Sequence, residues 1–389
     1  VEQLKASAAS RRSRILAKVA VEGKFADAKL LQAVFDKTSA EVECKHMGPP
    51  MSLDEAIAKH GDDFNVVQRY GIEQGLDSSG AIKYRCIDNH ADNENNNAAE
   101  RRQTVPMSSV AMITLIIRSL AIALGDRTKT EQWSLLGSTE DLKAAYRQCP
   151  LLSEQVCVAI TAVWNPLTKT IQFHEMWGQP FGAGHAVPNF YRLAEWFCRV
   201  SRRLLFLVID HFFDDYFTVE PKCTAPSGVW AFNRLAVAFG LVFDKGKQQL
   251  PRSVWHALGV HFDMSAIRSS GKVFVRPKPK RVVNAVREIL AIISDWRLKN
   301  THAARVFGRV DFLNTTIFGR VGRTGMLALK QRQMMTSTLD KWALTPTLEL
   351  ALLWIAEILF VAPPREIRTS ISRKRDSILL YTDGSSAPN

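Results

Sequence analysis

The 389-residue chain carries 51 Lys and Arg against 38 Asp and Glu, a formal net charge of +13. This length is more than one simple core usually needs, and 46% hydrophobic with 23% charged residues is typical of a globular protein. The basic excess favours a polyanionic partner, because neutralised phosphates release counterions, although a solvated basic surface without a partner is the alternative. Arg118 and Glu357 interrupt the two most apolar runs, 111–124 and 348–362. Both runs are too short to span a bilayer, so we expect buried helices and no membrane partner.

The cysteines and the N-terminal residues indicate the expected cellular location. None of the six cysteines forms a CxxC pair, which favours a reducing, intracellular location without a zinc site, in the cytoplasm or the nucleus. Residues 1–24 mix basic and apolar residues without a continuous apolar segment, so they predict no secretory signal. The chain begins with Val, and we expect it to be a fragment of a longer reading frame.

In chain order, residues 1–40 predict peripheral helices, and 83–88 predict a short strand. The polar, Asn-rich stretch 88–100 predicts a solvated linker. A helix is expected over 108–124 and a strand over 135–141.

The central part predicts a β-hairpin formed by 156–163 and 171–176 around Asn165-Pro166, followed by an amphipathic helix over 189–203. Two β-prone segments, 204–209 and 216–219, then flank a pair of aspartates. Further along, we expect a helix over 229–239, strands over 255–262 and 272–275, a basic linker over 276–281, mostly helix over 282–360, and a new strand at 379–382.

The sharpest chemical feature is a set of three aspartates. Asp141 ends one predicted strand, and Asp214-Asp215 lie at the tip of a predicted hairpin. Like charges this close are tolerated when a cation neutralises them. Hard oxygen ligands suit Mg²⁺, and two such ions can activate the attacking oxygen and stabilise the leaving oxygen in phosphoryl transfer. Asp62-Asp63, in contrast, is expected to be a simple loop pair.

Further motifs accompany the aspartates, and over about residues 83–383 the chain resembles the reverse transcriptase family of retrotransposons. The motifs that carry the resemblance are Lys83 and Arg85, Asp141 with Tyr146 and Gln148, Gln179-Pro180-Phe181-Gly182 with Phe190, Phe212-Phe213-Asp214-Asp215, Lys247 within 243–250, and Leu258-Gly259-Val260.

The resemblance implies a role for each motif. Asp141, Asp214 and Asp215 would be catalytic and, with the Leu142 carbonyl, would hold two Mg²⁺ ions, with Mn²⁺ as an alternative. Leu258 and Gly259 would form the primer grip. The residues that would bind the incoming dNTP are Lys83, Arg85, Leu142, Tyr146, Gln148, Phe181, Gly182 and Lys247.

Three of these roles have a plainer alternative. Tyr146 would exclude the 2′-hydroxyl of a ribonucleotide, or it is a core aromatic residue. Lys247 would protonate the leaving pyrophosphate, or it is a solvated lysine. Lys83 and Arg85 would hold triphosphate oxygens, or they are ordinary surface cations on a strand.

The chain also departs from the family pattern. Phe212 stands where the family usually has Tyr, and Phe181 stands where retroviral enzymes have Gln. Pro188 lies one residue later than the usual proline. Asp210 and His211 bring unusual polarity to the strand before the aspartates, and we expect them to be partly solvated and not metal ligands. None of these changes removes a predicted ligand.

The C-terminal part carries two further signals. Regularly spaced arginines in 303–323 are typical of helices along a duplex backbone, or of a solvated helix face. The segment Tyr381-Thr382-Asp383-Gly384-Ser385 resembles the first strand of a ribonuclease H domain, with Asp383 as its first catalytic carboxylate. Only six residues follow Asp383, so this chain alone would lack that nuclease activity.

We therefore predict an α/β (α+β) right-hand polymerase fold with fingers, a palm of antiparallel sheet and helices, and a helical thumb. The expected domains are an N-terminal helical extension (1–44), fingers and palm (45–265), thumb and connection (266–362), and a truncated ribonuclease H start (377–389). The expected activity is RNA-directed DNA polymerisation, with a primed RNA or DNA template and dNTPs as partners. The alternatives are a decayed or domesticated nucleic-acid-binding remnant and an RNA-dependent RNA polymerase; the oligomeric state stays open.

Overall fold

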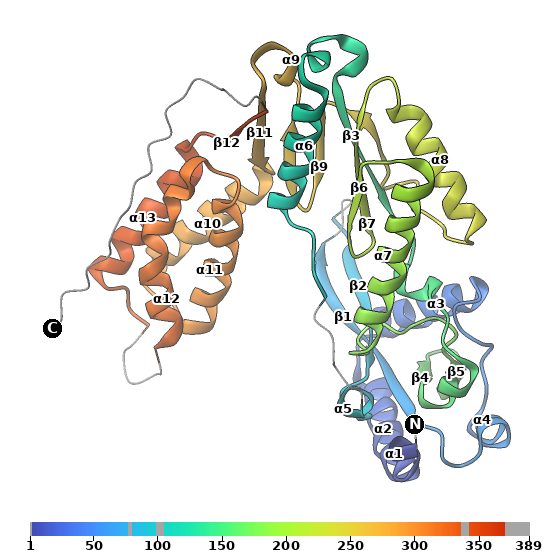
Figure 1. Ribbon diagram of the computed structural model, residues 1–389. Coiled ribbons are helices and arrows are strands. Elements are labelled where there is room, and N and C mark those ends of the chain that lie inside the picture. Colours follow the sequence, from blue (N-terminus) through green and yellow to red (C-terminus); the bar gives the residue numbers. More distant parts are fainter. Residues whose placement is uncertain (1, 77–79, 99–104, 336–341, 370–389) are drawn as a thin grey trace. The chain divides into compact units, whose positions relative to one another are not determined.

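The computed structural model describes residues 2–76, 80–98, 105–335 and 342–369 (Figure 1). Two compact units divide the chain. The first unit comprises Val1–Ser108, Glu140–Tyr216 and Trp230–Gln248, and the second comprises Ser109–Thr139, Phe217–Val229 and Gln249–Asn389. The predicted catalytic aspartates all belong to the first unit.

One part of the first unit is a four-stranded sheet covered by N-terminal helices. The strand order is β2-β1-β4-β5, with β1 antiparallel to β2, parallel to β4, and β4 antiparallel to β5. These strands span Val66–Leu76 (β1), Ile82–Asn89 (β2), Ile160–Asn165 (β4) and Thr170–Glu175 (β5). The helices are α1 (Glu2–Lys5), α2 (Ala8–Phe25), α3 (Ala28–Glu43) and α4 (Leu53–His60).

The N-terminal helices are not peripheral, contrary to the sequence-based expectation. Ile15 and Val19 of α2 are fully buried and share a core with Phe64, Ile160 and Phe173. The spacing of apolar residues predicts the helices correctly. A basic outer face, however, does not show whether the apolar face of an amphipathic helix covers a core.

The prediction of a solvated linker over 88–100 is also wrong where the structure describes it. Residues Asn95–Ala98 form a short helix, α5. His90, Asn93 and Asn95 are buried, as is Asn65, which precedes β1. The polar residues of this segment face the protein interior and bond to one another.

The rest of the first unit packs around α7 (Ala186–Leu205) and α8 (Ala225–Ala238). Phe190, Phe197, Tyr216 and Phe232 lie in one core cluster. The expected strand over 204–209 is misplaced, because α7 continues to Leu205 and strand β6 begins only at Ile209. A further four-stranded sheet, which is not confined to the first unit, has the order β6-β7-β3-β8 and contains Ile209–Phe212 (β6), Asp215–Pro221 (β7), Leu135–Asp141 (β3) and Gln249–Arg252 (β8).

In the second unit, α6 (Val110–Leu124) packs with a sheet of order β12-β11-β10-β9. Ser109 caps α6 by accepting from Met112 N–H. The four antiparallel strands are β9 (Val254–Ala257), β10 (Val260–Asp263), β11 (Lys272–Pro277) and β12 (Arg365–Arg368). The expected basic linker over 276–281 is wrong, because β11 runs to Pro277 and the next helix begins at Pro279.

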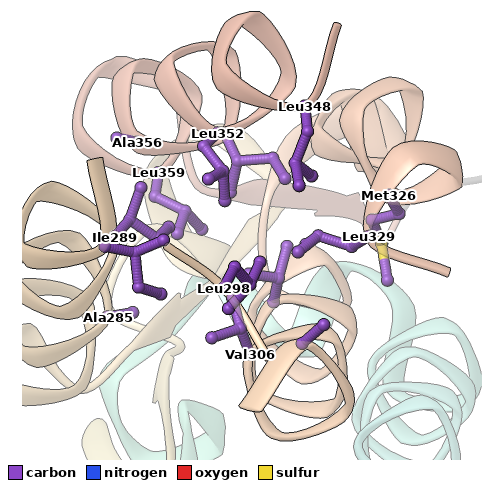
Figure 2. Packing of buried hydrophobic residues seen from close by; sticks show 14 of the residues in the cluster. Ala285, Ile289, Leu298, Val306, Met326, Leu329, Leu348, Leu352, Ala356 and Leu359 are labelled. Atoms are coloured by element: carbon purple, nitrogen blue, oxygen red, sulfur yellow. The ribbon is translucent and has the colours of Figure 1, made fainter. Parts of the chain in front are cut away.

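The second unit continues into a helical bundle whose core Figure 2 shows. Ile289, Leu329 and Leu352 are buried at its centre and come from three different helices, and Leu298, also buried, comes from the connection between two helices; Figure 2 shows these side chains packed together. The helices are α10 (Pro279–Asp295), α11 (Asn300–Asn314), α12 (Met326–Met334) and α13 (Pro346–Val361). Shorter helical pieces are η1 (Gly125–Lys129), η2 (Glu131–Trp133), η3 (Ala145–Gln148), η4 (Ser153–Val158), α9 (Ile267–Ser270) and η5 (Phe318–Gly325).

The structure confirms the expected fold class, a mixture of helices and largely antiparallel sheets. All six cysteines are free thiols. Among the helices of the described ranges, none is long and apolar enough to cross a membrane.

Candidate active site

Backbone hydrogen bonds bring the aspartates together. Asp141 is the last residue of β3, Asp215 is the first residue of β7, and Asp214 lies in the tight turn between β6 and β7. The N–H of Leu142 donates to the Asp214 carbonyl at 3.1 Å, and the N–H of Asp244 donates to the Asp141 carbonyl at 2.7 Å. These bonds hold the chain after β3 against the turn, so the acids lie in one place although they are far apart in sequence.

The turn itself is strained at one position. Phe213 has φ of +53°, the left-handed conformation that bulky residues adopt rarely. Strain of this kind costs about 1–3 kcal/mol and persists where the surroundings impose it. Here His211 Nδ1 donates to the Phe213 carbonyl oxygen at 3.2 Å, and Nε2 of the same ring lies 3.2 Å from Glu195 Oε2.

This contact corrects the expectation that His211 is partly solvated. His211 is buried, and its ring packs between Tyr191 and Tyr216. Asp210, its neighbour, is half-buried and forms a 3.0 Å ion pair with Arg202. The two polar side chains of β6 thus attach the hairpin to α7, through Arg202 and Glu195.

The electrostatics of the three acids are unbalanced. Burial, a hydrogen bond with the Asp141 carboxyl and the charges of Asp214 and Asp141 raise the pKa of Asp215 to about 7. Burial and the charge of Asp141 also raise the pKa of Asp214. The opposing cation is Lys247, whose Nζ lies 2.6 Å from Asp141 Oδ2, and this hydrogen bond raises the pKa of Lys247. One ammonium thus faces three carboxyl groups.

By their chemistry these residues fit a divalent cation. Carboxylate and carbonyl oxygens are the ligands that Mg²⁺ prefers, and a cation would relieve the repulsion that raises the two aspartate pKa values. Within the described residues, no three His, Cys, Asp or Glu side chains are already arranged as ligands of one ion. Binding would therefore require the carboxyl groups to turn toward a common point and Asp141 to exchange Lys247 for the ion.

An aromatic group lies beside the acids. The Tyr146 ring centroid is 4.9 Å from that of Phe181 and 4.8 Å from that of Phe190. Burial and the charge of Asp214 raise the pKa of the Tyr146 hydroxyl. Phe190 is fully buried, whereas Phe181 is 37% exposed. Tyr146 is thus half in the core and half at the surface beside Asp214, a position that fits either of its predicted roles.

The side-chain amide of Gln148 is hydrogen-bonded to backbone groups. Its amide nitrogen donates to the Lys143 carbonyl at 2.5 Å and to the Val242 carbonyl at 2.8 Å, and its amide oxygen accepts from Val242 N–H at 2.8 Å. These bonds join the chain after Asp141 to the segment that precedes Lys247. The side chain holds the site together, and a dNTP contact by Gln148 stays a prediction.

Lys83 and Arg85 are exposed on β2, two residues apart and therefore on one face of the strand. Arg85 lies opposite Ile72 of β1. Their exposure leaves both cations accessible to an anionic ligand, and their role stays a prediction.

A buried ion cluster was not anticipated from the sequence. Arg69 donates to both oxygens of Asp88, at 2.7 and 3.1 Å, and Arg147 donates to Asp88 Oδ2 at 2.8 Å. Glu41 lies 3.0 Å from Arg69 and 3.2 Å from Arg147. Burial disfavours the Asp88 carboxylate, but the charge and hydrogen bonds of Arg69 outweigh it, and the pKa of Asp88 lies below its usual range.

The cluster could have been suspected from one signal. Asp88 lies three residues after Arg85, so it faces the opposite side of β2 from the exposed Lys83 and Arg85. If that side is buried, an acid there needs a charged or polar partner. Its partners, Arg69 and Arg147, come from two separate segments, so sequence spacing did not identify them.

In the second unit, Leu258 and Gly259 form the tight turn between β9 and β10, with φ of +50° and +77°. The Arg281 guanidinium covers Gly259 so closely that a Cβ there would overlap it, and it also lies 4.9 Å from the Phe312 ring centroid. The turn is thus fixed against α10 and α11, and its role as a primer grip stays a prediction. Asp383 lies outside the described residues.

No family model matches the sequence, and no curated protein matches it. Solved structures match in fold. One is a foamy viral protease-reverse transcriptase in complex with double-stranded DNA, with a TM-score of 0.59, 13% sequence identity, and coverage of 86% of this chain and 49% of that chain. Another is a foamy viral protease-reverse transcriptase in complex with an RNA/DNA hybrid, with a TM-score of 0.58, 11% identity, and coverage of 87% and 38%.

This chain therefore spans about half, or less, of the length of those proteins. At identities this low the similarity shows the fold alone, and that fold is like that of the two reverse transcriptase structures.

Proposed function

We propose that the chain is the polymerase part of a retrotransposon reverse transcriptase, which adds dNTPs to a primer 3′-hydroxyl along an RNA or DNA template. The observation that carries the proposal is that Asp141, at the end of β3, meets Asp214 and Asp215 at a strained turn, with Lys247 as the cation bonded to them among the described residues. Folding alone disfavours such an excess of charge, whereas phosphoryl transfer by metal ions needs it. The reverse-transcriptase-like fold supports the same activity.

In this proposal Asp141 and Asp214 would hold two Mg²⁺ ions, with Asp215 and the Leu142 carbonyl beside them. When bound, such ions activate the attacking hydroxyl and stabilise the leaving oxygen. Release of Lys247 from Asp141 frees its ammonium to donate a proton to the leaving pyrophosphate.

The remaining side chains bind and select the nucleotide. Lys83 and Arg85 pair with phosphate oxygens, Arg85 with two at once. Tyr146, beside Asp214, lies beneath the sugar and excludes a 2′-hydroxyl. Phe181 extends the same aromatic surface toward the solvent.

The second unit supplies a basic surface for the template and primer. A cavity of about 590 Å³ opens between α10 and α11, with Arg281, Arg305 and Arg309 in its lining. Gly308 also lines it, and a Cβ there would meet no other atom within 4 Å, so the helix backbone is accessible. Guanidinium groups around an open backbone suit a phosphodiester chain.

Primer extension on poly(rA)/oligo(dT) with dTTP and Mg²⁺ tests the proposal. We expect extension that stops on chelation of the metal and resumes when Mg²⁺ is restored. Binding of the primed template without extension, in Mg²⁺ and in Mn²⁺, would favour the nucleic-acid-binding remnant instead.

A further inference from the structure

A carboxamide side chain holds the loop that follows Phe181. Asn96 of α5 donates from Nδ2 to the Gly182 carbonyl at 3.0 Å, and its Oδ1 accepts from Gly184 N–H at 2.6 Å. The two bonds have opposite polarity and lie on either side of Ala183. A single side chain therefore fixes both the position and the direction of this backbone.

Asn96 is itself held by a network of buried amides. Its N–H donates to the His90 carbonyl at 3.0 Å. Asn95 donates to the Val158 carbonyl at 2.8 Å and lies 3.0 Å from His90 Nδ1, and Asn65 donates to Asn95 Oδ1 at 2.9 Å. Buried polar groups are costly when unpaired, so a network bonded in this way resists movement.

The first half of the loop is held by other groups. Gly182 has φ of +97°, and a Cβ there would lie 2.7 Å from the Asp88 carbonyl oxygen, so only glycine fits. Arg147 donates to the Gln179 carbonyl at 3.3 Å, and its guanidinium lies 5.5 Å from the Phe181 ring centroid. Asn96 fixes the second half of the same loop, Gly182–Gly184.

We propose that Asn96 is a positioning residue: its carboxamide fixes the Gly182–Gly184 backbone so that Phe181 stays against Tyr146 and the incoming nucleotide meets a preformed surface. The inference rests on the proposed function, since it concerns the same nucleotide site. Asn96 acts only through the loop.

The Asn96→Ala variant tests this role in steady-state primer extension. Loss of two hydrogen bonds leaves the loop to be ordered by the nucleotide, so we expect KM for dNTP to rise about tenfold while kcat and the melting temperature change little. The matched control is Asn97→Ala, because Asn97 is exposed on the same short helix and its side chain makes no hydrogen bond within the described residues. It should behave as the wild type.

Asn96→Asp is a second variant of nearly the same shape. It keeps the acceptor for Gly184 N–H and loses the donor to Gly182, so we expect a KM that also rises. If both variants keep the wild-type KM, or lose kcat and melting temperature together at an unchanged KM, Asn96 has a merely structural role and the inference is overturned.

Hydrogen exchange separates this inference from the proposed function. The Gly184 amide should exchange slowly in the wild type and at least tenfold faster in Asn96→Ala. If the wild type fails to extend primers, the proposed function is wrong. Faster exchange in the variant would then still support the inference that Asn96 fixes the Gly182–Gly184 backbone. Equal exchange in both proteins would overturn it whatever the activity.

Discussion

The first unit contains two groups of acids and bases that differ in balance. In the buried ion cluster, Arg69 and Arg147 face Asp88 and Glu41, and the pKa of Asp88 lies below its usual range. At the hairpin, three carboxyl groups face one lysine, and the pKa of Asp215 is raised to about 7. In the buried ion cluster the opposite charges are equal in number, whereas the hairpin has an excess of carboxyl groups, as expected if a cation binds there in the proposed function.

The sharpest way to test this difference is to remove one hairpin charge. Asp214→Asn should lower primer extension by about 10³-fold or more, because a ligand of the reacting centre is lost, while the melting temperature stays equal or rises. Single-turnover extension and a thermal melt measure both. Asp210→Asn, on the same hairpin but paired with Arg202, is the matched control. Activity of Asp214→Asn within tenfold of the wild type would refute the assignment.

The opposite result is expected in the buried ion cluster. Asp88→Asn removes one of the two carboxylates that Arg69 and Arg147 share, and it is the more deeply buried one, so we expect the free energy of unfolding to fall by about 3–5 kcal/mol. Denaturant titration measures this loss. Asp63→Asn is the control, because Asp63 and its ion-pair partner Lys5 are both partly exposed, so the effect should stay below about 1 kcal/mol. Equal effects at both sites would remove the contrast.

Tyr146 lies beside Asp214 of the hairpin, and the next residue, Arg147, belongs to the buried ion cluster. Tyr146→Val should raise the rNTP/dNTP ratio of kcat/KM by roughly tenfold or more, since removal of a repulsive contact admits the 2′-hydroxyl. If Tyr146 is only a core residue, the same change leaves the ratio unaltered and costs about 2–4 kcal/mol of stability. An unchanged ratio would also revive the RNA polymerase alternative.

Stability should depend on pH in opposite directions at the two groups. The folded-state pKa of Asp215, about 7, lies above its ordinary value of ~3.9. Its proton therefore stabilises the fold fully below the ordinary value, and this contribution is lost as the pH rises through 7. For Asp88 the pKa is lowered, so its contribution is present above the ordinary value and is lost at lower pH.

We therefore expect Mg²⁺ to raise the melting temperature more at pH 8 than at pH 5, by a few degrees. In Asp215→Asn the difference between the two pH values should shrink. An equal effect of Mg²⁺ at both values, in thermal melts at constant ionic strength, would contradict the metal site.

A third kind of charge, exposed and without an ion pair within the described residues, is found at Arg305 in the second unit. Arg305→Ala should weaken binding to a primed template equally for every sequence. If Arg305 contacts one phosphate, the slope of log K against log salt should fall by about 0.9. Arg297→Ala, outside the lining of this cavity, serves as the control. An unchanged slope would exclude Arg305 from the interface.

Sequence patterns located the unbalanced group and missed the balanced one. Asp214-Asp215 break an apolar run, and that contrast is visible in the sequence alone. The Asn-rich stretch looks the same in sequence whether its amides face water or one another, so the burial of Asn93 and Asn95 was not predicted. His211 was misjudged for the same reason, because Glu195, its partner, lies on a different element.

Strand and helix types were predicted well where periodicity was strong, as in β3 and α7, and their ends were placed less well. The helix α7 extends beyond the expected 189–203 at both ends, and its last two residues, Leu204 and Leu205, are apolar and resemble the start of a strand. The pairing of the aspartates came from the motif order, while their hydrogen bonds to Leu142 and Asp244 depend on backbone geometry that no local pattern contains.

The short helix η3 places three neighbouring residues in three different environments: Tyr146 with the aromatic rings, Arg147 in the buried ion cluster, and Gln148 on the backbone near Lys247. A 3-10 helix has three residues per turn, so successive side chains point in separate directions. An exchange of one of these residues therefore acts first on one environment. Deletion of one residue would instead rotate all of them out of place, so in a library of variants this turn should accept exchanges far more readily than changes of length.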